Sequence, residues 1–207
     1  DRGRAGPEDS TGIRLNGGRP SLTLNPGRIA PLHPAFAGDG PHHWAPSRKT
    51  LAAEFELRGQ RLFVIVCHFK SMRSLTRREE DYAKKQRHAQ AEIVHYFAAD
   101  LLACDPRAAI VVLGDLNDVP GSKTLKILKG DLFHNLLEDL PRGQGYTRRH
   151  GGRPQALDKI LVSPALRLRA AAHIPHVNSD AGPGKPEPAS DHDPVLARLP
   201  AWANLDA

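Results

Sequence analysis

Residues 109–118 read AIVVLGDLND, an apolar run that ends in glycine, acids and an amide. The run at 109–113 is rich in Ile and Val and predicts a buried strand. Side chains that follow such a strand project into a cleft where backbone pairing ends. Asp115 could orient or deprotonate a water there, and the amide of Asn117 could hold a phosphoryl oxygen. The alternative is an Asx turn that only ends the strand.

A second apolar run lies upstream and has the same relation to polar residues. The stretch at 62–67, LFVIVC, predicts a central strand buried on both faces, and His68 and Lys70 follow it directly. Histidine could act as an acid or base near neutral pH, and the lysine could attract a phosphate. A strand-end histidine without a chemical role is the alternative. Alternating residues at 51–57 predict a half-buried strand just before this run.

Two further motifs stand at strand ends downstream. In LDKILV, at 157–162, Asp158 interrupts an apolar strand, and a buried carboxylate is costly unless it is paired, so we expect a histidine partner. An edge strand with Asp158 in water is the alternative. SDHDP, at 190–194, enters a last strand predicted at 194–199. Asp191 beside His192 could ligate a divalent cation or hold the imidazole for base catalysis, whereas a polar turn is the alternative.

The remaining pattern predicts helices between the strands. An apolar stripe at steps of three and four predicts a helix over 80–103, which Asp105 and Pro106 end. Ser122 is expected to cap a short helix that Gly130 closes. Strands that alternate with helices predict an α+β fold with layered sheets and helices outside. Residues 1–47 hold eight Gly and seven Pro without a sustained period, which predicts an irregular segment before a domain at 48–207.

The composition favours a polyanionic partner but does not identify one. The 207 residues suit one domain, and 29 Lys and Arg against 23 Asp and Glu give a formal charge of +6. Only Cys67 and Cys104 are present, so we expect no disulfide framework. No apolar stretch is long enough for a membrane span, and the sequence predicts a soluble protein. The compartment stays open, with secretion or a periplasmic location an option if a signal precedes Asp1.

In their order along the chain, the four motifs resemble the endonuclease/exonuclease/phosphatase superfamily, the deoxyribonuclease I-like proteins. The motifs are HFKS (68–71), GDLND (114–118), LDKILVS (157–163) and SDHDPV (190–195), and the resemblance runs over 48–199. Within the superfamily, the sequences of these motifs are most similar to those of bacterial extracellular nucleases. The resemblance implies a four-layer α/β sandwich of two packed β-sheets flanked by helices. It also implies hydrolysis of a phosphoric ester by an in-line water, with Mg²⁺ or Mn²⁺ as cofactor.

The resemblance assigns a catalytic role to five residues. His68 matches the histidine that assists departure of the leaving oxygen, and Asp158 matches the acid that orients it. Asp115 and Asn117 match the pair that positions the attacking water and the phosphate. His192 matches the histidine that contacts the scissile phosphate. We therefore expect the five side chains to converge on one point that can hold a phosphate.

Other residues match binding positions of the family. Arg48 and Lys70, together with Asn117, are expected to contact the substrate. Asp191 is expected to support His192 and to bind the metal, and Asp115 is a second possible metal ligand. Lys159 stands where the nuclease branch commonly has a histidine, which we expect to affect specificity more than chemistry.

Two features of the family are not recognised before Arg48. Family members carry an Asn at the end of their first strand and a metal-binding Glu about one strand later. Glu8 and Asp9 lie in a Gly- and Pro-rich context and are not assigned as ligands. The sequence therefore predicts the C-terminal part of the domain, without its principal Glu ligand, and the activity of this chain is left open.

Three functions are compatible with these motifs. The first is a nuclease that acts on DNA or RNA, which the basic stretch at 70–87 favours, although a solvated helix face explains such a run equally well. The second is a phosphatase or phosphodiesterase on lipid or phosphoinositide headgroups. The third is an inactive fragment that only binds phosphate or nucleic acid. No protein partner is predicted, and we expect a monomer.

Overall fold

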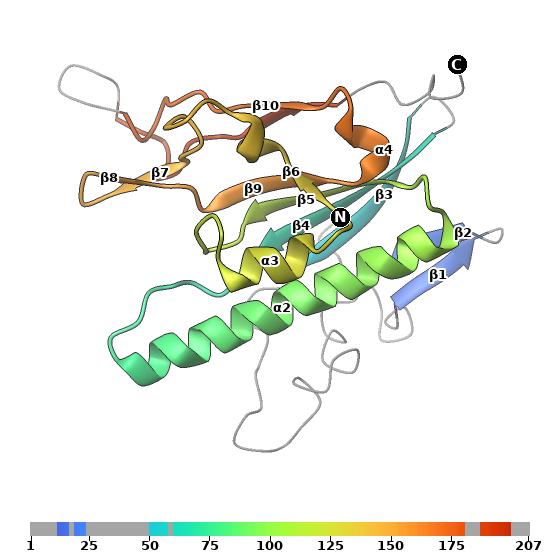
Figure 1. Cartoon of the computed structure of the whole chain (residues 1–207), viewed down its shortest axis with the longest axis horizontal. Helices are drawn as coiled ribbons and strands as arrows, with labels where there is room; N and C mark the ends of the chain where they lie inside the picture. Colours follow the sequence, from blue (N-terminus) through green and yellow to red (C-terminus); the bar gives the residue numbers. More distant parts are fainter. Residues whose placement is uncertain (1–11, 17–18, 24–49, 58–59, 181–186, 200–207) are drawn as a thin grey trace.

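Strands and helices alternate along the chain in the computed structural model, which describes residues 12–16, 19–23, 50–57, 60–180 and 187–199 (Figure 1). None of the helices in these ranges is long and apolar enough to cross a membrane. The helices are α2 (Arg77–Cys104), α3 (Lys123–Lys129), α4 (Pro164–Arg167) and the 3-10 helix η3 (Leu136–Asp139). The strands are β1 (Gly12–Asn16), β2 (Arg19–Thr23), β3 (Leu51–Leu57), β4 (Gln60–His68), β5 (Ala109–Asp115), β6 (His134–Asn135), β7 (Arg148–His150), β8 (Arg153–Gln155), β9 (Asp158–Val162), β10 (Ala171–His173) and β11 (Leu196–Arg198).

A five-stranded mixed sheet forms the centre of the fold. Its strand order is β3-β4-β5-β9-β6, with β4 parallel to β5 and the other pairs antiparallel. The apolar residues at the start of β5 are buried on both faces, as predicted, because β5 lies between two other strands and two covering layers. The α+β class is confirmed, and so is the sandwich of the deoxyribonuclease I-like type.

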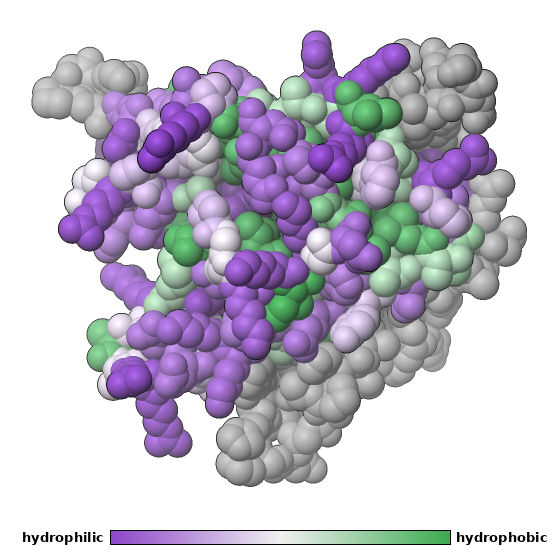
Figure 2. All heavy atoms as spheres, in the orientation of Figure 1, coloured by the Kyte–Doolittle hydropathy of each residue, from purple (hydrophilic) through white to green (hydrophobic). Residues whose placement is uncertain are grey.

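The long helix α2 and the short α3 cover one face of the sheet (Figure 1). The core on this side joins Ile65 of β4 and Ile110 of β5 to Leu101 of α2 and Leu128 of α3. A capping box at Thr76 starts α2 three residues earlier than the apolar stripe predicted, because the stripe marks only the buried face. Ser122 caps α3 and Gly130 ends it, as predicted. On this side of the molecule, hydrophilic side chains cover much of α2 (Figure 2).

The opposite face carries a second core cluster. It is built from Val111 of β5, Ile160 and Val162 of β9, Leu136 of η3 and Leu166 of α4. The antiparallel pair β10-β11 belongs to this layer, and β10 packs on η3. Both cysteines are free, as expected, and burial raises the pKa of the Cys67 thiol to about 12.

One burial prediction is wrong. β4 was expected to be buried on both faces, but only alternate residues are buried, and Val66 is 41% exposed. Its neighbour β3 likewise exposes Leu51 and Phe55. The physical reason is position: β3 is the edge strand, and the described elements of the second layer pack on β5 and β9 rather than on β3 and β4. An apolar run therefore marked a strand but not the coverage of its second face.

Part of the segment expected to be irregular is a β-hairpin. Residues 12–16 and 19–23 pair antiparallel as β1 and β2, with Gly12 opposite Thr23 and Asn16 opposite Arg19, and β2 lies beside β3. The Gly and Pro content of this stretch obscured the strands, although only one of each falls within them. The rest of segment 1–47 lies outside the described residues, so the domain boundary at 48 stays a prediction.

Gly114 allows β4 and β5 to approach at the end of the sheet. It pairs with Cys67 in the parallel register and has φ +127°, a conformation that glycine adopts without steric cost. A Cβ on Gly114 would lie 2.0 Å from the carbonyl oxygen of Cys67. Only glycine therefore fits between Leu113 and Asp115.

Gly114→Ala is expected to destabilise the fold by about 3 kcal/mol or more, since a backbone clash adds to the strain of a positive φ. Urea unfolding followed by circular dichroism measures the loss. Gly121→Ala is the matched control, because Gly121 also has positive φ but no atom lies within 4 Å of its added Cβ. Equal losses for the two variants would show that the close approach to Cys67 contributes nothing.

Candidate active site

Three of the predicted residues form a row across adjacent strands. In the register of the sheet, His68 of β4 lies opposite Asp115 of β5, and Asp115 lies opposite Asp158 of β9. Side chains alternate along a strand, so Asp115 shares the sheet face of Val111, and Asp158 shares that of Ile160. The row therefore stands at one end of the sheet, on the face of the second core cluster.

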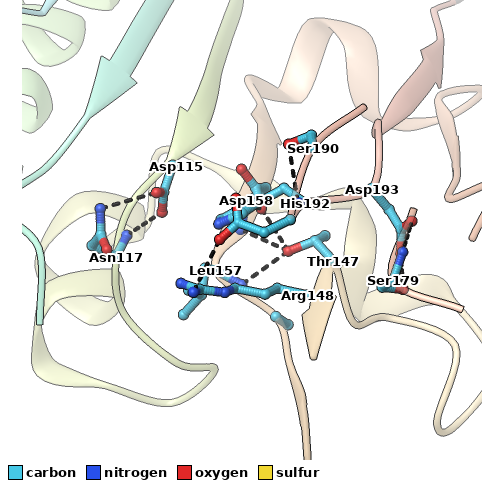
Figure 3. A network of polar contacts seen from close by, with 12 residues as sticks. Asp115, Asn117, Thr147, Arg148, Leu157, Asp158, Ser179, Ser190, His192 and Asp193 are labelled. Atoms are coloured by element: carbon cyan, nitrogen blue, oxygen red, sulfur yellow. Dashed lines mark hydrogen bonds and ion pairs between the residues drawn. The ribbon is translucent and has the colours of Figure 1, made fainter. Parts of the chain in front are cut away.

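Asp115 is held by the residue two positions after it. The backbone N–H of Asn117 donates to Oδ1 of Asp115 at 2.8 Å, and its Nδ2 donates to Oδ2 at 3.0 Å (Figure 3). The same amide donates to the carbonyl of Phe69 at 3.1 Å. Nε2 of His68 lies 3.5 Å from Oδ2 of Asp115. Asp115 thus forms the Asx-type turn considered above, in which Asn117 has φ +48°, and the same contacts fix the carboxylate.

Asp158 is paired with a histidine, and that histidine is His192. Nδ1 of His192 lies 2.6 Å from Oδ2 of Asp158, and the hydroxyl of Thr147 donates to the same oxygen at 2.6 Å (Figure 3). A carboxylate accepts, so Nδ1 carries the proton and the ring orientation is set. The expectation that Asp158 orients His68 is wrong in this structure, where His68 faces Asp115.

The segment that carries His192 is attached to β7. His192 forms a β-bridge with Arg148, and the N–H of Asp193 donates to the carbonyl of Thr147 at 2.7 Å. This attachment brings the imidazole of His192 into contact with Asp158. It explains why Asp158 pairs with His192 and not with His68. Thr147 therefore serves both sides of the pair, since its hydroxyl also accepts from the N–H of Leu157 and of Asp158.

Asp193 anchors the other side of that segment. Its buried carboxylate accepts from the N–H groups of Asn178 and Ser179 at 2.9 Å, from the Ser179 hydroxyl, and pairs with Nδ1 of His176 at 2.9 Å. Burial alone would raise the pKa of Asp193, but these hydrogen bonds outweigh it and lower the pKa to about 2. Asp193 thereby ties the loop at 176–179 to the backbone next to His192.

The row and the histidine pair together form a group that could hold a metal ion. One ligand atom from each of Asp115, Asp158 and His192 lies within 4.8 Å of the others, and all three residues are half-buried. Two carboxylates suit a hard cation such as Mg²⁺ or Mn²⁺, and the imidazole of His192 lies within reach of the same point. The donor set therefore fits the cofactor that the sequence predicted.

Asp191 lies outside this group. Its carboxylate is 70% exposed and sits 3.0 Å from Nη2 of Arg148. The expectation that Asp191 supports His192 is replaced by the pairing of His192 with Asp158. Its role as a metal ligand stays a prediction.

A buried clamp on α2 holds the loop after β4. Nε of Arg87 lies 3.1 Å from Oδ2 of Asp118, and its Nη1 donates to the carbonyl of Lys70 at 3.2 Å. The N–H of Lys70 donates to Gln90 of the same helix at 2.8 Å. Arg87 is buried, so this member of the basic stretch at 70–87 supports the loop after His68 and is not part of an exposed patch. Arg48, the other predicted cation, lies outside the described residues.

Arg87→Met is expected to lower the free energy of unfolding by about 3 kcal/mol, because it leaves the half-buried carboxylate of Asp118 without its cation. Chemical denaturation measures the change. Lys84→Met on the same helix is the control, since the Lys84–Glu80 pair is exposed and screened by water. If the two variants unfold at the same denaturant concentration, the clamp contributes no stability.

Lys159 points away from the metal-binding group. It alternates with Asp158 along β9, is 1% exposed, and donates to the carbonyl of Ala156. Burial lowers the pKa of Lys159 to about 8 despite three nearby acids. It lines a pocket of about 440 Å³ whose walls include Val119 and Tyr146. Lys159 therefore lies in the wall of a neighbouring pocket, and its expected effect on specificity stays a prediction.

The five residues that the sequence assigned to catalysis lie close together, and their catalytic roles stay predictions. Their contacts run from His68 through Asp115 and Asn117 on one side to Asp158 and His192 on the other. Sequence reasoning missed the residues that connect them. Thr147 stood in the stretch of family resemblance without a role, and no local pattern marked Arg87 or Arg148, because their partners lie on other elements.

The polar cluster at the end of the mixed sheet thus contains two neighbouring acids and a half-buried Asp–His pair, a group that could hold a metal ion. Residues 12–192 match the profile of the Endonuclease/Exonuclease/phosphatase family. The chain belongs to this family. The comparison with curated proteins finds no match.

Solved structures with a similar fold support the architecture. Truncated Caenorhabditis elegans TDP2 is 18% identical with a TM-score of 0.57, and 78% of this chain aligns to 61% of it. Beta toxin from Staphylococcus aureus is 20% identical with a TM-score of 0.56, over 73% of this chain and 57% of the toxin. An AP endonuclease from Archaeoglobus fulgidus is 19% identical with a TM-score of 0.54, over 72% and 64%. The chain thus spans less than two thirds of each of these structures.

Proposed function

We propose that this chain carries the catalytic centre of a divalent-metal-dependent phosphodiester hydrolase whose substrate is DNA or RNA. The observation that carries the proposal is the convergence of Asp115, Asp158 and His192 within 4.8 Å, beside His68. Membership of the Endonuclease/Exonuclease/phosphatase family supports hydrolysis of a phosphoric ester. The substrate class rests on charge, since the formal charge of the chain is +6.

In the proposed reaction, an in-line water attacks the phosphorus and no covalent enzyme intermediate forms. Asp115, held at both oxygens by Asn117, orients the water and accepts its proton. The Nδ1–H of His192 donates a hydrogen bond to Asp158, and in the protonated ring the Nε2–H donates to the scissile phosphate. His68 lies beside Asp115 and assists departure of the leaving oxygen.

Asn117 has a positioning role in this scheme. Its side-chain amide donates to Asp115 and to the carbonyl of Phe69, so both of these hydrogen bonds are made to protein groups. Contact with a phosphoryl oxygen would require one of these bonds to be released. We therefore assign Asn117 first to the orientation of Asp115.

The metal would be held by Asp115 and Asp158, with His192 within reach. A divalent cation supplies screening of the phosphate charge and stabilisation of negative charge that develops on oxygen. In the described part of the chain, Oδ2 of Asp158 accepts from Thr147 and pairs with His192, and no described residue donates to its Oδ1. That oxygen is the one that a cation would take.

His192→Ala and Asp158→Asn are each expected to lower the cleavage rate by about 100- to 10,000-fold, because the first removes the phosphate contact and the second frees the imidazole. The assay measures nicking of plasmid DNA and cleavage of RNA with Mg²⁺, using the full-length gene product that contains this chain. Asp100→Asn, on the exposed side of α2, is the matched control and should keep wild-type activity.

Cleavage of neither nucleic acid by the wild-type protein would remove the proposed substrate. A panel of phospholipids and phosphoinositides run beside it detects the alternative, through release of a phosphorylated headgroup or inorganic phosphate. Equal rates for wild type and His192→Ala would remove the proposed centre itself.

Metal binding can be tested without activity. Asp115→Asn and Asp158→Asn should each weaken Mn²⁺ binding, measured by the loss of the free-ion signal in electron paramagnetic resonance, by about tenfold or more, because each removes an anionic oxygen ligand. Asp139→Asn, in η3 and paired with His134, is the control that leaves the group intact. Unchanged Mn²⁺ affinity in both site variants would show that the cation binds elsewhere.

A further inference from the structure

Arg148 stands beside the catalytic centre, and the catalytic scheme does not use it. It belongs to β7 and forms the β-bridge to His192. In Figure 3 its side chain extends past Thr147 toward the side of the view where Asp115 and Asn117 lie. Its neighbour Arg149 makes different contacts, pairing with Asp180 and lying over the ring of Tyr146. Of these two adjacent arginines, only Arg148 contacts the segment of His192.

The guanidinium of Arg148 is only partly satisfied within the protein. Its Nη2 pairs with Asp191 at 3.0 Å, but its Nε is buried and has no hydrogen-bond partner among the described residues. A buried donor without an acceptor is destabilising, and more so when it is cationic. Asp191 is 70% exposed, and an ion pair to an exposed carboxylate adds little stability. Arg148 is therefore poorly explained by a role in folding.

We propose that Arg148 is a substrate-binding residue that takes a phosphate oxygen of the diester next to His192, with Asp191 as its counterion when no substrate is bound. This inference rests on the proposed function. The Arg148 side chain is 29% exposed, and its two Nη groups form a planar fork from which a phosphate can accept two charge-assisted hydrogen bonds. Binding of the phosphate at Nη2 releases Asp191 to water. The fork thereby recognises the phosphodiester backbone and not a particular base.

The role of Asp191 follows from this exchange. It competes with the incoming phosphate for Arg148, so its removal should strengthen binding of the substrate. If Asp191 were a metal ligand, its removal would instead weaken binding of the cation, because an oxygen ligand would be lost. The two roles can therefore be separated by one substitution.

The test measures binding of a fluorescein-labelled oligonucleotide by anisotropy, in the presence of a chelator so that cleavage does not interfere, over a range of salt concentrations. Arg148→Gln should weaken binding by about 10- to 100-fold, the loss of a charge-assisted fork. The slope of log affinity against log salt should fall by about one, because one phosphate contact is removed. Arg148→Lys should keep the slope but bind more weakly, since lysine has no fork.

Arg149→Gln is the matched control, with the same change of charge on the next residue of the strand. It should bind close to wild type, and all variants should keep the wild-type melting temperature. Equal losses for Arg148→Gln and Arg149→Gln would overturn the inference, since general charge would then explain both. Asp191→Asn should tighten oligonucleotide binding and leave Mn²⁺ binding unchanged. Loss of Mn²⁺ binding in that variant would show that Asp191 is a metal ligand and would overturn its proposed role as the counterion of Arg148.

Activity separates this inference from the proposed function. With Mg²⁺ and the full-length gene product, Arg148→Gln should raise KM for the oligonucleotide far more than it lowers kcat. An unchanged KM in an active enzyme would overturn the role of Arg148 alone. A wild-type protein that binds the oligonucleotide through Arg148 but cleaves no nucleic acid would overturn the proposed function and leave the binding role supported.

Discussion

The pairing of β5 with its two neighbours is the constraint on which the site depends. The register of β4, β5 and β9 places His68 opposite Asp115 and Asp115 opposite Asp158, and backbone hydrogen bonds hold this register. Gly114 permits that register, since a side chain there would collide with Cys67. A shift of one residue along any of these strands would turn His68, Asp115 or Asp158 to the other face of the sheet. The spacing of these three side chains is therefore set first by main-chain pairing.

Around this sheet, buried polar contacts connect the remaining parts of the site. Arg87 ties α2 to Asp118 and to the loop after His68, and Thr147 lies between Asp158 and the strand that carries Arg148. These contacts are buried or half-buried, so their loss leaves polar groups without partners in a region of low dielectric. The candidate site thus depends on helix, sheet and loop together, although His68, Asp115 and Asp158 stand on strand ends.

Much of this arrangement could be predicted from the sequence, because it depends on local pattern. Apolar runs marked β4, β5 and β9, and the polar residues at their ends marked the site. The partner of Asp158 could not be predicted, since the choice between His68 and His192 depends on how a distant segment returns to β7. The exposed face of β4 was missed because burial depends on neighbouring elements, and the hairpin β1–β2 was hidden by glycine and proline.

The segment that carries His192 differs in kind from the strands that carry the acids. Asp115 and Asp158 cannot separate without opening the ladder between two central strands, whereas the imidazole is placed by one bridge and the anchor at Asp193. The positions of Asp115 and Asp158 are therefore fixed by the sheet, whereas the position of His192 can change with its loop. The sheet sets the distance between the carboxylates of Asp115 and Asp158. The position of the His192 imidazole depends instead on the length and the anchoring of the loop that carries it. A change confined to that connection can therefore move His192 while Asp115 and Asp158 keep their spacing.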